Sequence, residues 1–370
     1  MENRYLNLHV LISHSPSCLN RDDMNMQKSA RFGGVRRVRV SSQCLKRAIR
    51  KSDRYGELMG ESSTRTRSDE ALLKHLRNLL RFESFSDDEL NLVIKRSGMQ
   101  NNVVTPWMMD EIETIVKAIH SVCLEKGITA VDLGEVVEKA SAKEKTGNKA
   151  LDIAMDKAVE EVRKTGISCA DIALAGRMCA SGILPSIEGA LSLSHSITTH
   201  AMEAEIDWFT AMDDLTQETE ETGAGHLNTQ EFGSGVFYRY ASINLEQLSQ
   251  NLGGDMERTL RIAGDFAELL ATVVPTGKQR SFASYVLADL VFAVRSNMPI
   301  ALHNAFEKPV SGKKIEGLMG PSIKALGQYW NLIYSGYGLK DRSAVFSLRE
   351  ETDLRERVDT LQDLLAWIKK

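Results

Sequence analysis

A long block of helical patterning divides two parts of this 370-residue chain that carry strand patterning. From about residue 66 to residue 165, apolar side chains recur at helical spacing. β-Branched and aromatic segments then return, and we expect strands at 167–174, 191–199, 236–243 and 286–295. Helices expected at 251–274 and 321–333 would pack against the resulting sheet. The chain is therefore predicted to have an α+β fold with a helical insertion.

The N-terminal part alternates between apolar and polar residues at 5–13, which predicts a strand. Leu6, Leu8, Val10 and Ile12 share one face, and the opposite face is mostly polar. We therefore expect only one face of this strand to be buried.

A helix is expected directly after a polar loop at 14–28 and a short strand at 36–40. Ser41 or Ser42 is a good N-cap. Leu45, Ala48 and Ile49 then form an apolar stripe, so the helix can bury one face and present its cations on the other.

Overall composition is that of a globular protein with a sizeable core. Hydrophobic residues make up 42% and charged residues 26%. We find no apolar run of membrane-span length and no signal-peptide pattern at the N-terminus, and we expect a cytoplasmic protein without a membrane partner. The five cysteines have no spacing typical of a zinc site or a disulfide framework, so we expect reduced thiols.

The strongest local signal is a basic stretch at 28–51, which contains nine cations and no acidic residue although the formal net charge of the chain is −4. Solvated surfaces usually mix both signs, so this stretch favours a phosphate-bearing partner, with binding that weakens steeply as salt rises. Gly33 and Gly34 supply a turn, and the helix start supplies free N–H groups. The cations are Lys28, Arg31, Arg36, Arg37, Arg39, Lys46, Arg47, Arg50 and Lys51.

Other constellations are weaker. Asp22 and Asp23 could hold a divalent ion for RNA hydrolysis, but capping a turn or pairing with Arg21 is the simpler interpretation. His195 and His200 lack the spacing of two ligands on one helix face, and we expect no metal or cofactor.

Two further motifs stay open at this stage. The run at 176–182 is bracketed by glycines but lacks the lysine of a phosphate-binding P-loop. Its Arg177 and Met178 could meet a nucleic-acid backbone and a base, or could simply end a strand. Trp208 and Phe209 could pack in the protein or stack on bases.

Longer runs of residues resemble the CasC family, the repeated backbone subunit of the type I-E CRISPR Cascade complex. The N-terminal run is NLHVLISHSPSCLNRDD at 7–23. The others are FGG at 32–34, RRVR at 36–39, SSQ at 41–43, GRM at 176–178, ITTH at 197–200, DWFTA at 207–211, TQEF at 229–232, GVFYRY at 235–240 and NAFEK at 304–308. The helical block at about 64–165 shows little of this resemblance.

The resemblance implies a hand-shaped α+β fold. Its palm resembles an RNA-recognition-motif (ferredoxin-like) domain and carries a helical fingers insertion and a β-hairpin thumb. The implied boundaries are 1–59 for the first part of the palm, 60–190 for the fingers, 191–201 for a palm strand, 202–236 for the thumb and 237–370 for the rest of the palm.

The resemblance also implies which residues bind nucleic acid. Guide-RNA contacts are expected at Asn20, Arg21, Lys28, Ser41, Gln43, Lys46, Arg50 and Lys51. Met178, Phe209 and Thr210 would wedge at a kink in the guide, and Lys145, Lys149 and Lys157 would contact target DNA. Val35 stands where relatives carry a lysine after the two glycines, so one guide contact is missing or is replaced by Arg36.

The function implied is that of a non-catalytic scaffold. Copies of the chain would line up on one CRISPR RNA, kink it at intervals and present it for pairing with target DNA. The other Cascade subunits CasA, CasB, CasD and CasE would be partners. The alternative is a metal-dependent endoribonuclease of the RAMP superfamily, to which such backbone subunits belong, acting through the loop aspartate Asp22 or Asp23.

Overall fold

The computed structural model describes two compact units, and each is treated by itself. The first comprises residues 1–54, 193–242 and 263–370, and the second comprises 55–192 and 243–262. The described residues are 3–97, 103–142, 144–179, 182–202, 205–211, 225–312, 317–350, 352–354 and 356–370. Side chains at 207–230 are also outside the description.

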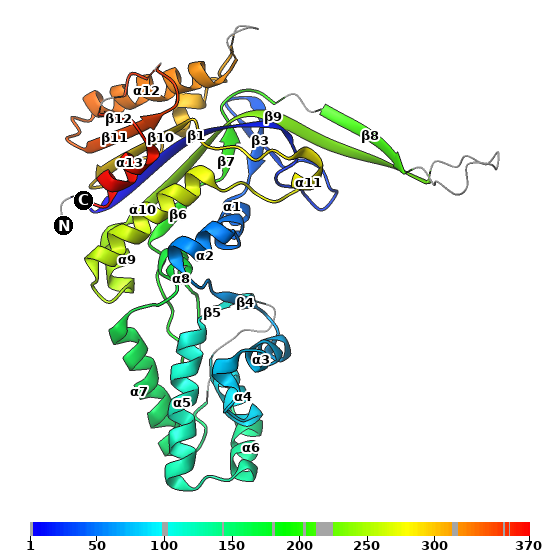
Figure 1. Cartoon of the computed structure of the whole chain (residues 1–370), viewed down its shortest axis with the longest axis vertical. Coiled ribbons are helices and arrows are strands. Elements are labelled where there is room, and N and C mark those ends of the chain that lie inside the picture. Colours follow the sequence, from blue (N-terminus) through cyan, green and yellow to red (C-terminus); the bar gives the residue numbers. More distant parts are fainter. Residues whose placement is uncertain are drawn as a thin grey trace. The chain divides into compact units, whose positions relative to one another are not determined.

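The first unit is built on a large, mainly antiparallel sheet (Figure 1). Its main strand order is β12-β11-β10-β1-β9-β7-β3-β2, and β8 pairs with β9 outside this path. These strands are β1 (Tyr5–Ser17), β2 (Ser29–Phe32), β3 (Val35–Val40), β7 (Ser196–Thr198), β8 (Glu205–Ala211), β9 (Gly225–Asn244), β10 (Leu290–Ser296), β11 (Arg342–Ser347) and β12 (Arg357–Val358).

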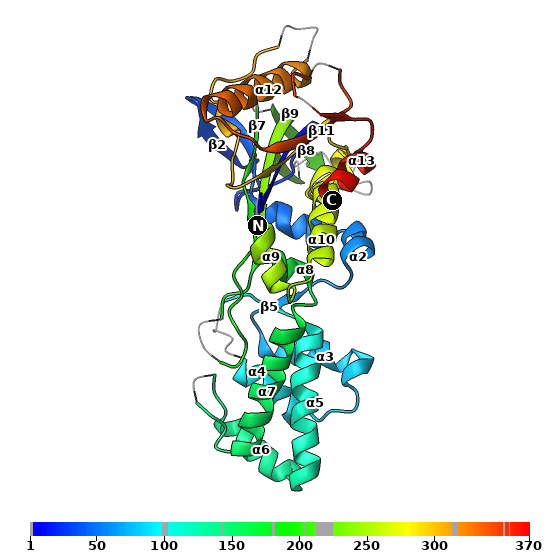
Figure 2. The same ribbon diagram turned by 90° about the vertical axis from the view of Figure 1, so that its left-hand side faces the viewer.

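Helices lie on both faces of this sheet. On one face, α12 covers a core that includes Phe292, Phe306 and Trp330. On the other face lie α1, α13 and the C-terminal half of α10 (Figure 2). The helices of this unit are α1 (Ser42–Arg50), α10 (Met256–Thr272), which begins in the second unit, α11 (Gln279–Phe282), η2 (His303–Phe306), α12 (Met319–Gly336) and α13 (Leu361–Ile368).

Burial of β1 on both faces corrects the expectation of one buried face. Asn7, His9 and Leu11 are as fully buried as Leu6 and Leu8. Both polar side chains form hydrogen bonds inside the unit: Asn7 accepts one from the Tyr240 hydroxyl at 2.9 Å, and His9 Nδ1 lies 2.7 Å from the Tyr238 hydroxyl. The other ring nitrogen of His9, Nε2, is buried without a hydrogen-bond partner among the described residues. Sequence alternation alone could not show that both faces would be covered, because hydrogen-bonded polar groups can be buried.

The second unit is mainly helical. Its elements are β4 (Thr64–Thr66), α3 (Asp69–Arg77), η1 (Leu80–Phe82), α4 (Asp87–Arg96), β5 (Thr105–Trp107), α5 (Met109–Lys126), α6 (Ala130–Lys139), α7 (Lys149–Thr165), α8 (Ala170–Ala175), β6 (Leu191–Leu193), which ends in the first unit, and α9 (Leu245–Asn251). The boundary between the two units falls within α2 (Asp53–Met59), after Arg54. Side chains such as Phe82, Trp107 and Ile115 form the core, and α5 packs along α7.

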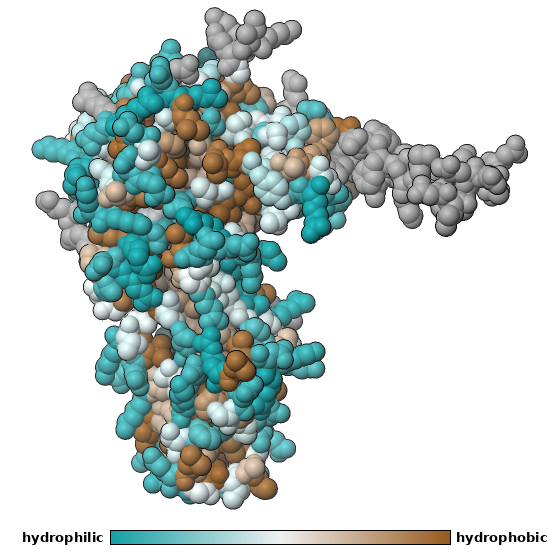
Figure 3. Space-filling view, viewed as in Figure 1, coloured by the Kyte–Doolittle hydropathy of each residue, from teal (hydrophilic) through white to brown (hydrophobic). Residues whose placement is uncertain are grey.

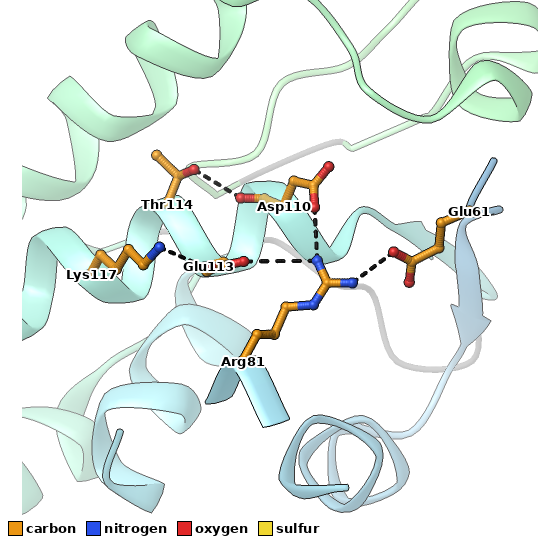
Figure 4. A network of polar contacts seen from close by, with 6 residues as sticks. All are labelled: Glu61, Arg81, Asp110, Glu113, Thr114 and Lys117. Atoms are coloured by element: carbon orange, nitrogen blue, oxygen red, sulfur yellow. Dashed lines mark hydrogen bonds and ion pairs between the residues drawn. The ribbon is translucent and has the colours of Figure 1, made fainter. Parts of the chain in front are cut away.

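A network of ion pairs at the surface links the start of α5 to neighbouring elements. Arg81 lies 2.7 Å from Glu61 and 2.8 Å from Asp110, and its guanidinium also approaches Glu113 (Figure 4). Hydrogen bonding to Glu61 raises the pKa of Arg81 above its ordinary value. The network joins η1 and the segment before β4 to one exposed side of α5.

Several expected elements are confirmed and one is wrong. β3, α1 and α12 form where expected, and β8 and β9 pair as antiparallel strands. Residues 212–224, which separate these two strands in the sequence, lie outside the described residues. The strand expected at 167–174 is instead the buried helix α8. Three of its six residues are alanine, the best helix former, and this local preference outweighs that of the β-branched Ile172.

On the face drawn in Figure 3, hydrophilic side chains cover much of both units and hydrophobic side chains gather in patches among them. None of the described helices combines the length and the apolar composition of a membrane span.

Candidate nucleic-acid interface

The basic stretch folds into a hairpin followed by a helix. β2 and β3 are joined at Gly33 and Gly34, whose φ angles are 59° and 78°. Positive φ at both central residues is the requirement of a type I′ hairpin turn, which explains the two glycines. The chain then enters α1, where Ser41 Oγ accepts a hydrogen bond from Cys44 N at 3.2 Å. Ser41 is therefore the N-cap, and of the two serines expected as candidates it is the first.

Asn20 holds the start of α1 against the preceding loop. Its side-chain oxygen accepts a hydrogen bond from Ser41 N at 2.9 Å, and its carbonyl accepts one from Lys28 N at 2.8 Å. Gln27 donates to the same carbonyl at 3.1 Å. Asn20 and Ser41, both expected to bind RNA, thus have structural roles that shape the surface around Lys28.

The nine cations differ in what they offer to a ligand. Arg31, Arg47 and Lys51 are exposed, and Lys28, Lys46 and Arg50 are half-buried. Arg36 is exposed but pairs with the buried Glu231 at 2.9 Å. Among the other predicted contacts, Arg21 and Gln43 are exposed. Most of the predicted RNA-binding side chains on the loop and on α1 are therefore at least partly accessible.

Arg37 is an exception, because it is fully buried. Its guanidinium donates to four main-chain carbonyls: Phe32 at 3.3 Å, Thr198 at 3.1 Å, Phe306 at 2.8 Å and Glu307 at 3.3 Å. Burial lowers the pKa of Arg37 below its ordinary value. This residue ties the β2–β3 hairpin to β7 and η2, and it is not part of the accessible surface.

Positive charges of the loop, β3 and α1 act on neighbouring groups, and Lys28 contributes to each of these effects. Burial lowers the pKa of His195, and the charges of Arg39 and Lys28 lower it further. Burial raises the pKa of the Cys44 thiol, and the charges of Lys28 and Arg47 oppose that rise. Arg39 also lies 3.0 Å from His195 Nδ1. Residues distant in sequence therefore contribute to one positive potential at this surface.

Beside α1 lies a hollow of about 430 Å³, which is large enough for a polar ligand group. Asn20, Arg21 and Arg47 line one part of it, and the turn containing Thr276 and Gly277 lines another. A Cβ at position 277 would lie 2.8 Å from the Leu19 carbonyl, so this turn packs directly on the chain that leads into the loop.

Asp22 and Asp23 also line this hollow, but Asp22 is engaged by its own loop. One carboxylate oxygen of Asp22 accepts hydrogen bonds from Met24 N at 3.0 Å and Met26 N at 2.9 Å. Asp22 therefore caps a turn. Within the described ranges, no group of three or more His, Cys, Asp or Glu side chains gathers as a metal site.

Met178, Phe209 and Thr210 are placed to different degrees. Met178 is 86% exposed on the second unit. Phe209 and Thr210 belong to β8, where Phe209 pairs with Asn228, but their side chains lie outside the described residues. The neighbouring Arg177 is buried and paired with Glu111 at 2.5 Å, so it is not available to a nucleic-acid backbone.

The three lysines expected to contact target DNA are all exposed, but no single hollow is lined by all three. Lys145 lines a hollow of about 1090 Å³ together with Arg163 and Lys164. Lys157 lines a different hollow of about 510 Å³, between α5 and α7, together with Lys117. Lys149 is the first residue of α7. A DNA contact through Lys145 and one through Lys157 would therefore use different hollows of the second unit.

Comparison with known proteins gives the family. The model of the CT1975-like proteins matches residues 6–367. The chain belongs to the CT1975-like family. Two solved chains share its fold, a "CRISPR RNA-guided surveillance complex, pre-nicking" and a "CRISPR RNA-guided surveillance complex". The first is 24% identical with a TM-score of 0.78, covering 98% of this chain and all of the other. The second is 23% identical with a TM-score of 0.61, covering 98% and 99%. No curated protein matches the sequence.

The family match confirms the resemblance to Cascade backbone proteins inferred from the sequence. Sequence reasoning nevertheless missed two parts of the site. The turn at Thr276 and Gly277 is remote from the basic stretch in sequence, and it carries no charge pattern that would have drawn attention. The burial of Arg37 was also missed, because an arginine on a short strand looks the same in sequence whether it faces water or main-chain carbonyls.

Proposed function

We propose that this chain is a non-catalytic, guide-RNA-binding backbone subunit of a type I-E CRISPR Cascade complex. The observation that carries the proposal is the cationic surface of Lys28, Arg47 and Lys51 on the hairpin–helix unit, within a chain of the CT1975-like family. Several copies would line up along one guide, together with the subunits CasA, CasB, CasD and CasE.

The strand order of the first unit supports an RNA-recognition-motif-like palm. In chain order, β1, α1, β7, β9, α10 and β10 follow the βαββαβ pattern of ferredoxin-like domains. In the sheet, β10, β1, β9 and β7 are neighbours in that order. We propose the remaining parts of the hand on the resemblance: fingers at 60–190 and a thumb at 202–236.

The guide would be held by its phosphates. Lys28, Lys46, Arg50 and Lys51 carry charges to phosphate oxygens, and the first turn of α1, which has no acidic residue, offers N–H groups at the positive end of the helix dipole. Phosphate contacts carry no sequence information, so pairing with target DNA would supply specificity. Met178, with Phe209 and Thr210 of a thumb, would displace a base at intervals. Lys145, Lys149 and Lys157 would contact target DNA.

Neutralising three of the expected phosphate contacts, on α1 and at its C-cap, tests this proposal. A Lys46→Gln/Arg50→Gln/Lys51→Gln variant should fold but bind guide RNA weakly. Each single-strand phosphate contact contributes about 0.7 to the slope of log affinity against log salt, so losing three should reduce that slope by about 2. The measurement is RNA affinity over a series of salt concentrations.

A matched variant controls for net charge. Lys126, Lys324 and Lys340 are exposed and lie outside the basic stretch, so changing all three to Gln alters the formal charge equally. This control should keep the salt slope of the unaltered protein. Equal slopes for the two triple variants would contradict a phosphate-binding role for α1.

A further inference from the structure

Met178 projects into solvent from a short segment that is fixed on both sides. A methionine side chain is flexible and apolar, and 86% exposure leaves most of it unpacked. The residue before it is buried, and the residue after it is half-buried. The position of Met178 therefore depends on how its two neighbours are held.

Arg177 is held by a buried ion pair and by main-chain bonds. Its guanidinium donates to both carboxylate oxygens of Glu111, at 2.5 and 2.9 Å, and to the Pro185 carbonyl at 3.2 and 3.3 Å. Its backbone exchanges two hydrogen bonds with Ile187, at 2.9 and 2.7 Å. Glu111 is 1% exposed on α5, a helix in the core of the same unit.

Ser186 holds the residue on the other side. Its hydroxyl accepts a hydrogen bond from Cys179 N at 3.0 Å and donates one to the Cys179 carbonyl at 2.7 Å. The 185–188 segment is itself anchored, because the Asn251 amide donates to the Glu188 and Ala173 carbonyls, both at 2.8 Å. Met178 thus lies between two residues, Arg177 and Cys179, that are both hydrogen-bonded to the rest of the helical unit.

A buried ion pair is weak evidence for stability, since removing two charges from water costs about as much as their attraction returns. Its fixed bidentate geometry does restrict orientation. On the same helix, Asp110 and Glu113 pair with Arg81 at the surface (Figure 4), whereas Glu111 reaches inward to Arg177. The inward pair holds the backbone that carries the exposed methionine.

We propose that Glu111, Arg177 and Ser186 are positioning residues that hold Met178 as a rigid wedge against a base step of the bound guide. This rests on the proposed function, and it assigns roles to three residues that do not themselves touch RNA. A wedge displaces a base reproducibly only when its supporting groups hold it in one place.

The experiment compares variants in assembled particles by chemical probing of guide bases. Met178→Ala defines the pattern without the wedge. Ser186→Ala removes two hydrogen bonds at an exposed site and should leave the unfolding midpoint unchanged, yet it should abolish the periodic reactivity of displaced bases as Met178→Ala does. Ser186→Thr, which retains a hydroxyl, should restore the reactivity.

A second variant keeps the test valid if one substitution disturbs folding. Glu111→Leu/Arg177→Met replaces the ion pair with apolar side chains, an exchange that buried pairs often tolerate. It should keep guide RNA but lose periodic reactivity. Arg81→Met, which breaks the surface network on the same helix, should retain the periodic pattern.

The outcomes separate this inference from the proposed function. Failure of the unaltered protein to retain RNA would overturn both. Retained RNA, with reactivity lost in Met178→Ala but intact in Ser186→Ala and in the Glu111/Arg177 double variant, would overturn the positioning role alone. Loss of periodic reactivity in all three, with RNA and unfolding midpoint preserved, is the result we expect.

Discussion

Replacing Arg37 with methionine should destabilise the first unit without acting through RNA. Methionine keeps much of the aliphatic length but removes every donor. The carbonyls of Phe32, Thr198, Phe306 and Glu307 would lose their bonds to a fully buried guanidinium. The β2–β3 hairpin would then lose its link to β7 and η2.

The magnitude follows from those bonds. The two at 2.8 and 3.1 Å are well formed, and the two at 3.3 Å are weaker. A hydrogen bond to a charged group contributes about 1.5–3 kcal/mol. The loss is partly offset because the methionine variant no longer has to bury a charge. We therefore expect the free energy of unfolding to fall by about 3–5 kcal/mol, measured by urea denaturation of the RNA-free protein.

Arg31→Met is the matched control, since Arg31 lies on the same hairpin but is exposed. It should change the free energy of unfolding by no more than about 0.5 kcal/mol. The reasoning is refuted if the free energy of unfolding of Arg37→Met lies within about 1 kcal/mol of that of the unaltered protein, because two of the four bonds, those to Thr198 and Phe306, are buried and their loss leaves buried carbonyls without a donor.

Three further predictions concern acid stability, the loop and the helix start. Burial, more than nearby charge, lowers the pKa of both His9 and His14 to about 3. As pH falls below about 6.5, the unfolded chain binds protons that the folded chain excludes, so each histidine should lower the free energy of unfolding by about 2 kcal/mol at pH 5 and by almost nothing above pH 7. In denaturation experiments at several pH values, His9→Gln should lose less stability between pH 7 and pH 5 than the unaltered protein does. An equal loss in the two proteins would contradict this. Asp22→Ala should remove the two hydrogen bonds that cap the turn at 22–26. With Mg²⁺ or Mn²⁺ present, the purified variant and the purified unaltered protein should not differ in RNA cleavage. Divalent-dependent cleavage that disappears in the variant would instead favour the endoribonuclease alternative. Asn20→Ala removes the acceptor of Ser41 N and should cost about 1–2 kcal/mol in urea denaturation, whereas Gln43→Ala at the exposed first turn should be nearly neutral; equal effects would argue against the structural role of Asn20.

The start of α1 and the short strand β3 could be predicted because local chemistry decides them. Ser41 caps α1 through its own hydroxyl, and Leu45 and Ile49 are buried at helical spacing. By contrast, α8 was mistaken for a strand, since a short apolar run cannot be assigned by periodicity alone.

The site was predictable in charge but not in detail. Complete absence of acids between 28 and 51 located the cationic surface. Which arginines face solvent depends on tertiary contacts. Arg37 donates hydrogen bonds to carbonyls of β7 and η2, and Arg177 donates to a carboxylate on α5. Pairings across long sequence separations leave no signal in local pattern, and the same is true of the Thr276–Gly277 turn beside the loop.

The RNA that accompanies the purified protein tests the central claim most directly. The chain, produced in cells with a CRISPR array and the other Cascade subunits, should retain RNA of uniform length that contains spacer sequence, whatever that sequence is. The Lys46→Gln/Arg50→Gln/Lys51→Gln variant should retain far less. No RNA on the unaltered protein, or the same random fragments on both, would contradict a guide-binding role.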